Sequence, residues 1–502
     1  MNTWEITTKK LKYYPHFDEK ISFKNIKTLV TDPQKVASHS FYPLLHYEEK
    51  YQPFRLKNKP EKKSRPIKYA CRADSYIYSY YRHKLSRLYE EELNNRGIFD
   101  CVLAYRNIPI ASGSTKGKCN INFAKDAFDR ISDFGNCIVI TADISSYFDS
   151  IDHGKLKREW CKLLGEKKLP NDHFAVFKNI TKYSEVDQRE LYERLGYFGK
   201  KKGYKQDGFL HKKGDIPTKL CSNKEFREKV VCKGGESLIK TNPNNYGIPQ
   251  GSPISDVLAN LYLIDFDEKI NDFAAGLGGF YTRYSDDLLL IIPSTNENIS
   301  YMATKFLREE IKKTGNEIKI QKKKCASLIY RKVGERITFD TIKAFEKDEE
   351  TGEEKSLVKM KNGLEYLGFR FDGSKVYLRD KTISKFYRKI KKNASARAHR
   401  WVKSYPNKSL EELLESFNYD AFFQKFGKVE GFYQANTIGV DRYSSWTFHT
   451  YAKRASIAFG SQGEPILRQI RNYKKNAYRD LQKKITHIYD KKLELDLFEV
   501  DD

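Results

Sequence analysis

Three aspartates stand where a sheet could bring them together. Asp143 closes the apolar run Cys137–Ala142, which is typical of a buried strand. Asp286 and Asp287 lie at the bend between two further strand-like runs, within Gly278–Ile292. If these strands are neighbours, the three carboxylates meet at one edge of the sheet. Hard oxygen ligands gathered there would suit Mg²⁺ better than zinc.

Such a carboxylate cluster predicts nucleotidyl transfer. Two Mg²⁺ ions about 3.5–4 Å apart stabilise both the attacking and the leaving oxygen of an in-line phosphoryl displacement. The alternative is that the Asp286–Asp287 pair only forms the turn of a hairpin, because Asp is a common turn residue. On the pair alone, the two interpretations stand about even.

A glycine-bracketed loop and a helix separate the two acidic sites. The loop GIPQGSP covers Gly247–Pro253, and apolar residues then recur at helical spacing as far as Phe266. Ser252 has the form of a helix N-cap, and Pro253 that of a first helical position. The pattern predicts a packed helix entered through a tight loop.

The remaining elements can be placed more coarsely. Residues 1 to about 60 are polar and Lys-rich, without a motif. Residues 65–93 predict a strand or loop that runs into an amphipathic helix, and residues 121–131 predict another helix. The stretch 196–245 is basic and aperiodic, which favours an inserted lobe or loop outside the core. Beyond Asp380 the pattern predicts a helical domain, with basic amphipathic segments at 381–402, 408–427 and 466–489.

The composition points to a nucleic-acid partner. The chain has 502 residues with 92 Lys or Arg against 66 Asp or Glu, a net charge of +26. Because the excess is spread along the chain, a large anionic partner such as nucleic acid is favoured over a membrane surface. The eight cysteines lie too far apart for a CxxC zinc site, and no apolar run is long enough to cross a bilayer. We therefore expect a reduced cytoplasmic protein without a membrane segment.

Seven short patterns occur in the order in which reverse transcriptases carry them, and over residues 60–375 the chain resembles that family. DISSYFDSIDH at Asp143–His153 is similar to the first palm motif of retron and group II intron enzymes. The other six are RPIKY (Arg65–Tyr69) and AYR (Ala104–Arg106), which resemble fingers motifs, GIPQGSP, YSDD (Tyr284–Asp287), IQKKKC (Ile320–Cys325), and YLGF (Tyr366–Phe369), which resembles the primer grip.

The family resemblance implies a fold and a domain order. The fold is α/β, with an α+β palm in a right-hand polymerase that also has fingers and an all-helical thumb. The expected divisions are an N-terminal extension (1–60), fingers (61–135), a palm with the basic insertion (136–375), and a helical thumb and RNA-binding C-terminal domain (376–502).

The resemblance also implies roles for particular residues. Asp143, Asp286 and Asp287 match the ligands of two Mg²⁺ ions, which Mn²⁺ could replace, and the backbone carbonyl of Ile144 is a further contact. Lys324 matches a lysine that would protonate the departing pyrophosphate. The alternative for Lys324 is a nucleic-acid-facing charge run, since Lys322 to Lys324 are consecutive.

Four residues match nucleotide-binding positions. Arg106 would pair with the triphosphate, and Phe148 would act as a steric gate against a ribose 2′-hydroxyl. Gln250 and Gly251 match the loop that lies against the incoming nucleotide and the template. The alternatives are a solvated charge for Arg106, core packing beside Tyr147 for Phe148, and a plain helix-entry turn for the two loop residues.

The resemblance favours synthesis of cDNA from dNTPs on a partner noncoding RNA. This RNA would serve as template or scaffold. Homo-oligomers are also possible in this class. The chain departs from the usual motif at Gln321 and Cys325 and shows no Cys- or His-rich endonuclease module after the palm. It is therefore most similar to defence-associated bacterial enzymes that act against phage, and its length and motif variants resemble the type 9 branch. Alternatives are a template-independent DNA polymerase with the same palm, an RNA polymerase, which Phe148 disfavours, and a non-catalytic RNA-binding scaffold.

Overall fold

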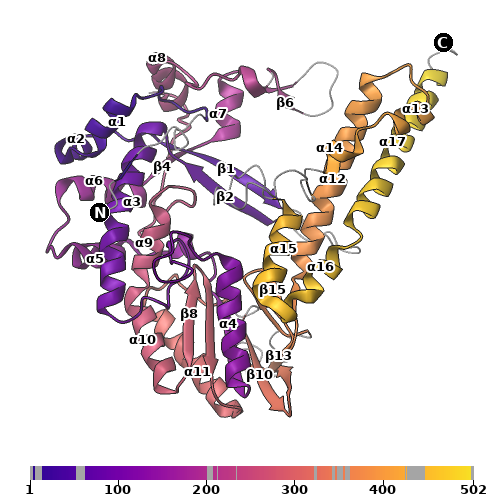
Figure 1. Cartoon of the computed structure of the whole chain (residues 1–502). Helices are drawn as coiled ribbons and strands as arrows, with labels where there is room; N and C mark the ends of the chain where they lie inside the picture. Colours follow the sequence, from indigo (N-terminus) through magenta and orange to yellow (C-terminus); the bar gives the residue numbers. More distant parts are fainter. Residues whose placement is uncertain are drawn as a thin grey trace. The chain divides into compact units, whose positions relative to one another are not determined.

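Two compact units make up the chain (Figure 1). Unit 1 comprises Met1–Arg106, Ile140–Ile292 and Asn298–Cys325, and unit 2 comprises Asn107–Val139, Pro293–Glu297 and Ala326–Asp502. The structure is a computed structural model that describes residues 4–5, 14–51, 63–200, 207–211, 213–232, 234–321, 325–341, 345–347, 354–356, 362–423, 426 and 447–498.

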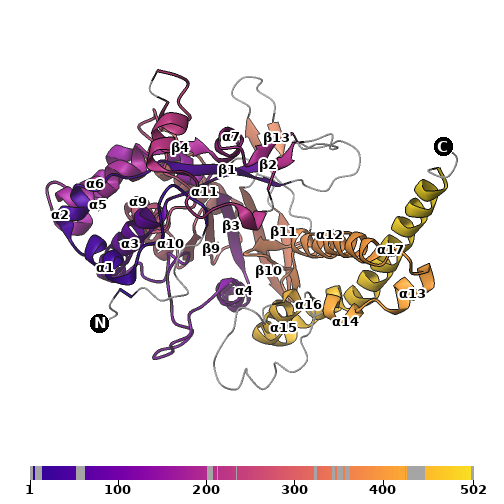
Figure 2. The same ribbon diagram turned by 90° about the horizontal axis from the view of Figure 1, so that it is seen from above.

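The first two helices of unit 1 begin at well-formed caps. Ser22 caps α1 (Phe23–Val30), and Asp32 followed by Pro33 opens α2 (Pro33–Ala37). These two helices pack on α3 and α6 respectively (Figure 2). The other helices and helical turns of the unit are α3 (Arg72–Asn95), η2 (Tyr147–Ser150), α5 (His153–Leu164), α6 (Asn171–Thr181), α7 (Gln188–Arg194), η3 (Lys213–Asp215), α8 (Asn223–Glu225), η4 (Phe226–Val231), α9 (Ser255–Tyr262), α10 (Ile264–Gly276) and α11 (Glu297–Lys312).

One sheet of unit 1 unites the N-terminal region with the basic insertion. Its strand order is β2-β1-β4-β7, formed by Lys63–Tyr69, Leu44–Tyr51, Ser184–Asp187 and Lys240–Thr241. Leu45 lies opposite Tyr69 on one side and Val186 on the other. The insertion adds the short hairpin β5 (Phe198–Gly199) and β6 (Gly208–Phe209).

The insertion is part of a buried cluster, so the expectation of a lobe outside the core was wrong. Its Ile216, Leu220 and Val230 are at most 8% exposed and pack with Phe17 and Leu45 of the N-terminal region. The sequence pattern concealed this because the buried residues fall in short, irregular segments. Burial of such side chains contributes about 1.5–3 kcal/mol each, which is enough to order segments without periodicity.

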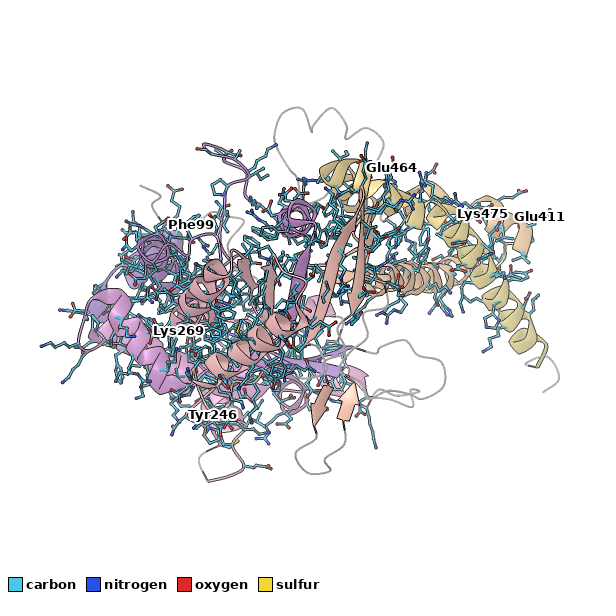
Figure 3. The ribbon with its side chains drawn as sticks, turned by 90° about the horizontal axis from the view of Figure 1, so that it is seen from below. Phe99, Tyr246, Lys269, Glu411, Glu464 and Lys475 are labelled. Atoms are coloured by element: carbon cyan, nitrogen blue, oxygen red, sulfur yellow. The ribbon has the colours of Figure 1, made fainter. Side chains whose placement is uncertain are left out.

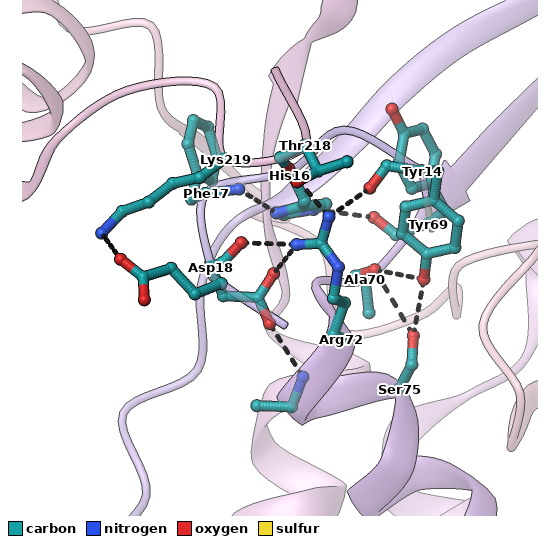
Figure 4. A network of polar contacts seen from close by, with 12 residues as sticks. Tyr14, His16, Phe17, Asp18, Tyr69, Ala70, Arg72, Ser75, Thr218 and Lys219 are labelled. Carbon is teal, nitrogen blue, oxygen red and sulfur yellow. Dashed lines mark hydrogen bonds and ion pairs between the residues drawn. The ribbon is translucent and has the colours of Figure 1, made fainter. Parts of the chain in front are cut away.

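Arg72 fastens three segments of unit 1 together (Figure 4). Its side chain is 1% exposed and donates from Nη1 to Asp18 Oδ1 at 2.9 Å. Its Nη2 donates to the carbonyls of Tyr14 and Thr218, at 2.7 and 2.8 Å. Beside it, the backbone of His16 pairs with Thr218 and Leu220 at 3.0 and 2.8 Å. The N-terminal segment is therefore held against the insertion by a buried cation and a short parallel ladder.

A second sheet carries the acidic residues. Strand β3 (Cys137–Asp143) belongs to both units, and in unit 1 its residues 140–143 lie beside β9 (Asp287–Ile292), which pairs with β8 (Phe280–Tyr284). Helix α10 packs on β8 (Figure 1). Thus the apolar run and the two strand-like runs form adjacent strands, as the sequence predicts.

Unit 2 combines small sheets with long helices. Its strands are β10 (Ala326–Val333), β11 (Arg336–Thr341), β12 (Phe345–Lys347), β13 (Glu354–Ser356), β14 (Leu364–Tyr366), β15 (Phe369–Phe371) and β16 (Val376–Leu378). Its helices are α4 (Asn120–Phe134), α12 (Asp380–Ser404), α13 (Leu410–Glu415), α14 (Tyr419–Phe423), α15 (Phe448–Phe459), η8 (Gly460–Gly463), α16 (Glu464–Ile470) and α17 (Tyr473–Phe498). The described residues beyond Asp380 are helices and connections, as predicted.

Two long basic helices, α12 and α17, pack side by side in unit 2 (Figure 1). A ladder of buried residues at four-residue spacing, from Phe386 to Val402, faces a core that includes Leu481 and Ile485 of α17. Trp401 Nε1 donates to the carbonyl of Leu413 at 2.9 Å and ties α13 to this pair. Among the helices that the structure describes, none is both long and apolar enough to span a lipid bilayer.

Candidate active site

The backbone brings the three predicted acidic residues together at one end of the second sheet. The amide of Ile144, directly after Asp143, donates to the carbonyl of Asp286 at 3.0 Å. On the other side, the amide of Gln321 donates to the carbonyl of Asp143 at 2.7 Å. Asp143 therefore ends β3 beside the hairpin bend of Asp286 and Asp287. All three side chains are partly exposed, so a ligand can reach them.

The donor set at this strand end fits a divalent cation in kind. Carboxylate and carbonyl oxygens are the ligands that Mg²⁺ and Mn²⁺ prefer. Within the described ranges, no group of three or more His, Cys, Asp and Glu side chains is gathered closely enough to hold a metal ion. The backbone thus places the carboxylate-bearing residues side by side, whereas the side chains do not stand in a coordinating arrangement. Ile144 is 1% exposed, and only its backbone carbonyl is a candidate ligand.

The bend that carries the acids is a two-residue hairpin turn, Tyr284–Asp287, which we name the catalytic turn. Tyr284 pairs with Asp287, so Ser285 and Asp286 form the loop and Asp287 already begins β9. Ser285 has a φ of +60°, a left-handed conformation that costs a non-glycine residue free energy. This strain implies that surrounding contacts hold the turn in place.

Tyr105 contacts the catalytic turn, a role that the sequence pattern did not indicate. It has a φ of +66°, and its hydroxyl lies 3.0 Å from Ser285 Oγ. Burial raises the pKa of Tyr105, and the neighbouring Asp286 charge raises it further. The available signal was its place in AYR, directly before the arginine that the motif singles out.

Arg106 lies inside the protein, in conflict with the predicted triphosphate contact. Its side chain is 3% exposed. Its Nε donates to both carboxylate oxygens of Glu90, at 2.9 and 3.1 Å, and Nη1 donates to the carbonyls of Phe99 and Val102. The guanidinium also lies 4.2 Å from the ring of Phe99, which is labelled in Figure 3. These partners already occupy the guanidinium, so Arg106 anchors the AYR segment to α3.

Gln250 and Gly251 lie against the RPIKY strand. The amide of Lys68 donates to the carbonyl of Gln250 at 2.9 Å. Gly251 has a φ of +115°, and a Cβ there would lie 2.7 Å from the carbonyl oxygen of Lys68. The resemblance places this glycine against the incoming nucleotide and the template, and the neighbour observed is the chain's own β2.

The helix after the loop begins later than expected. The N-cap of α9 is Ile254 and its first residue is Ser255, so the assignment of Ser252 as N-cap was wrong. The physical reason is a tight turn in which the amide of Ser255 donates to the carbonyl of Ser252 at 3.3 Å. Ser255 Oγ closes the loop by donating to the carbonyl of Pro249 at 2.7 Å.

Phe148 lies in η2, between the acidic strand and the loop. Its carbonyl accepts from the amide of Ile248 at 2.8 Å, which joins η2 to the Gly247–Gly251 loop. Its partly exposed ring lies 5.8 Å from the ring of Tyr147. Both the steric-gate role and the packing alternative are compatible with this position. Lys324 lies outside the described residues.

In unit 2, the YLGF motif forms a strained hairpin. Leu367 and Gly368 are its two loop residues, with φ of +44° and +96°. Asn120 Nδ2 donates to the carbonyl of Leu367 at 3.0 Å and to the hydroxyl of Tyr451 at 2.9 Å. The tip is thus held by α4 and α15.

Residues 210–371 match the family described as reverse transcriptase (RNA-dependent DNA polymerase). The Retron Ec86 reverse transcriptase of Escherichia coli is 40% identical over 80 residues, 16% of this chain and 24% of that protein. The Retron Mx162 reverse transcriptase of Myxococcus xanthus is 29% identical over 104 residues, 21% of each chain. The aligned parts therefore span about a quarter of these relatives or less.

Solved structures of yeast telomerases are also similar. Apo telomerase from Candida tropicalis, truncated from its C-terminal domain, matches at 10% identity and a TM-score of 0.36, over 72% of this chain and 61% of that one. Telomerase from Candida albicans with a fragment of telomeric RNA matches at the same identity and score, over 91% and 67%. Together with the sheet that carries the catalytic turn, the family match assigns the right-hand polymerase fold. The chain therefore contains a reverse transcriptase domain, which residues 210–371 match.

Proposed function

We propose that this protein is an RNA-directed DNA polymerase that makes cDNA on a partner noncoding RNA in antiphage defence. The observation that carries the polymerase assignment is the 3.0 Å hydrogen bond from Ile144 to Asp286, since it joins the strand ends bearing all three acids. The match to a reverse transcriptase family and the partial likeness to two retron enzymes support it.

In the proposed reaction, a primer 3′-hydroxyl gives up its proton to solvent and attacks the α-phosphorus of a dNTP, and the bond from that phosphorus to pyrophosphate breaks as the new P–O bond forms. Asp143, Asp286 and Asp287, with the carbonyl of Ile144, would hold two Mg²⁺ ions, which stabilise the attacking and leaving oxygens when bound. Lys324 would return a proton to the pyrophosphate. Phe148 would exclude a ribose 2′-hydroxyl and so select dNTPs.

The long helices of unit 2 would dock the RNA. On α12, exposed cations lie on the side opposite the buried Phe386–Val402 ladder and span most of the helix, about 35 Å at 1.5 Å per residue. We name this set the α12 stripe: Lys381, Lys385, Lys389, Lys392, Arg400 and Lys403. Helix α17 adds further exposed cations such as Lys475, labelled in Figure 3. Cations in a row match a phosphate backbone.

The finer placement follows the motif variants. Gln321 and Cys325 replace the usual motif residues, which favours a defence-associated enzyme of the type 9 branch, with homo-oligomers as one form of assembly. We place the protein in the cytoplasm, where free thiols such as its eight unpaired cysteines stay reduced.

A polymerase assay tests the assignment. The purified protein with its co-purified RNA and dNTPs should yield DNA complementary to that RNA. The Asp286→Asn, Asp287→Asn double variant should yield none, although it still binds the RNA. DNA whose sequence ignores the RNA would indicate a template-independent polymerase, and RNA binding without DNA synthesis by the unaltered protein would indicate a scaffold.

A plating assay tests the defence role. Cells that carry the protein and its RNA should resist phage, and the double variant should abolish that resistance. Protection that persists with the double variant would contradict a role for DNA synthesis in defence.

A further inference from the structure

A fully buried ion pair lies beneath the catalytic turn. Arg283 of β8 and Asp267 of α10 are both 0% exposed. Arg283 Nε donates to Asp267 Oδ1 at 2.8 Å, and Nη2 donates to Oδ2 at 2.6 Å. Tyr281 Oη adds a third donor to Oδ1, at 2.7 Å. The carboxylate thus accepts from three donors, and the two bonds from Arg283 fix the orientation of the guanidinium plane.

The remaining arm of the guanidinium reaches the catalytic turn itself. Arg283 Nη1 donates to the carbonyl of Ser285 at 3.1 Å and to Asn260 Oδ1 at 3.2 Å. Ser285 is the loop residue with a φ of +60°, and it directly precedes Asp286. The ion pair therefore contacts the strained residue that sets the direction of the acidic side chains.

The same network reaches the segment that carries Tyr105. Asn260 Nδ2 donates to the carbonyl of Ala104 at 2.9 Å. The backbone of Arg283 pairs with Cys101 and Leu103, with N···O distances of 2.7 and 2.9 Å. Arg283 thus holds the Ser285 carbonyl, and Tyr105 holds the Ser285 hydroxyl.

Folding stability alone does not account for this arrangement. A buried ion pair frequently contributes no more to stability than well-packed apolar side chains of the same volume, because desolvation offsets the attraction. What apolar residues cannot provide is a fixed donor to the Ser285 carbonyl. The ion pair therefore fixes the geometry of the turn, and its contribution to folding stability does not explain this effect.

We propose that Asp267 and Arg283 are positioning residues for catalysis, with Asp267 orienting Arg283 so that its guanidinium fixes Ser285 and, through it, Asp286 and Asp287. This inference rests on the proposed polymerase function. It predicts that loss of the Asp267 charge leaves nucleotide and RNA binding in place and slows the chemical step, because misplacement of reacting groups by about 1 Å can cost about 100-fold in rate.

The test compares Asp267→Asn with Asp18→Asn in full-length protein bound to its RNA. Asp18, which is 11% exposed, forms another ion pair of unit 1 with the buried Arg72 and lies in the N-terminal segment. We expect Asp267→Asn to lower kcat about 100-fold, with KM for dNTP and the Kd for RNA within about twofold. Both variants should lower the Tm by a similar amount, because each leaves a buried arginine without its carboxylate partner. Asp18→Asn should nevertheless retain kcat per folded molecule.

A double variant separates positioning from a general loss of structure. If Asp267 acts through Arg283, adding Asp267→Asn to Arg283→Lys should lower kcat by no more than about a further twofold, whereas independent losses would multiply. Equal kcat losses in Asp267→Asn and Asp18→Asn, or no loss in Asp267→Asn, would overturn the inference.

If Asp267→Asn does not fold, Arg283→Lys provides the same test. Lysine keeps the charge beside Asp267 but lacks the planar fork that reaches the Ser285 carbonyl at the same time. The expected result is a folded protein with lowered kcat, and retained kcat would overturn the inference. If the unaltered protein makes no DNA in the same assay, the proposed function fails instead.

Discussion

At the scale of single residues, the site depends on which side chains face the nucleotide and which face the core. Phe148 has a partly exposed ring beside the Gly247–Gly251 loop. Arg106 has a buried guanidinium bound to Glu90. The two residues were both expected to contact the nucleotide, and their surroundings lead to different predictions.

Replacing Phe148 by Ala should admit ribonucleotides. Without the ring, a 2′-hydroxyl no longer meets a steric barrier, so the ratio of kcat/KM for dNTP to that for rNTP should fall by at least about tenfold. Single-nucleotide incorporation measures both values. Tyr147→Phe, which removes only a hydroxyl bonded to the carbonyl of Ala259, serves as the control and should retain the ratio. Unchanged discrimination in Phe148→Ala would refute the steric role.

Replacing Arg106 by Gln should destabilise the fold and leave the KM for dNTP nearly unchanged. The substitution removes charge-assisted bonds to Glu90, which is partly exposed, so we expect the free energy of unfolding to fall by about 1–3 kcal/mol. Denaturant unfolding and nucleotide titration measure the two quantities. Glu90→Gln should produce a similar destabilisation. A rise of more than about tenfold in KM would instead support a triphosphate contact.

At the scale of elements, function depends on the close packing of segments that are distant in sequence. The loop before α9 lies against β2 through Gly251, and the N-terminal segment lies against the insertion through His16 and Arg72. Hydrophobic periodicity indicated neither junction, because each partner segment is short.

A side chain at Gly251 should separate the loop from β2. In Gly251→Ala, the Cβ would lie 2.7 Å from the carbonyl of Lys68, and the φ of +115° disfavours any L-residue. We expect about a tenfold or greater fall in kcat/KM for dNTP, with primer–template binding retained. Gly276→Ala is the matched control, because its Cβ would meet nothing within 4 Å. Equal activities of the two variants would show that the close approach is dispensable.

The junction at His16 should weaken in mild acid. Burial lowers the pKa of His16 to about 3, and its Nδ1 accepts from the amide of Phe17 at 2.8 Å. In the unfolded chain, histidine titrates near pH 6.5, so below that pH the unfolded state binds a proton that the folded state does not. Stability therefore falls as the pH drops from about 6.5 toward 3.

Urea unfolding at about pH 7.0 and pH 5.5 checks this. The unaltered protein should lose about 1 kcal/mol more than His16→Gln between the two pH values, because the variant lacks the titrating ring. An identical pH dependence in both proteins would mean that His16 accepts a proton in the folded state.

At the scale of the whole molecule, we expect the net charge of +26 to govern the affinity for the proposed RNA partner. Cations that contact phosphates release condensed counterions, so affinity falls steeply with salt. The α12 stripe and the exposed cations of α17 lie on helices of unit 2 that share one buried core.

Charge reversal on the α12 stripe should lower the salt dependence of RNA binding. For Lys385→Glu, Lys389→Glu, Lys392→Glu, the slope of log Kd against log salt should fall by about three, because each reversed lysine no longer neutralises a phosphate. Filter binding over a salt series measures the slope. The same reversal at Lys269, Lys305 and Lys312 of α10 and α11 gives an equal change in net charge. If both triple variants behave alike, only the overall charge matters.

Local patterns in the sequence were enough to predict the order of elements and the acidic positions. The strand before Asp143, the hairpin around Asp286 and the helices after Asp380 follow from hydrophobic periodicity and turn residues, which act over a few neighbours. The motifs indicated the polymerase class in the same way, because each is a short stretch of sequence that can be recognised without knowledge of the fold.

The inward-facing arginines and the extent of the core depend instead on contacts between segments far apart in the chain. The local sequences around Arg106 and Arg283 do not show that either side chain is buried; Glu90 of α3 and Asp267 of α10 set their orientations. Residues of the insertion are buried in the core because they pack with Phe17, which lies about 200 residues earlier in the chain. Such choices depend on which charges and apolar faces meet after folding, and short-range patterns in the sequence do not contain that information.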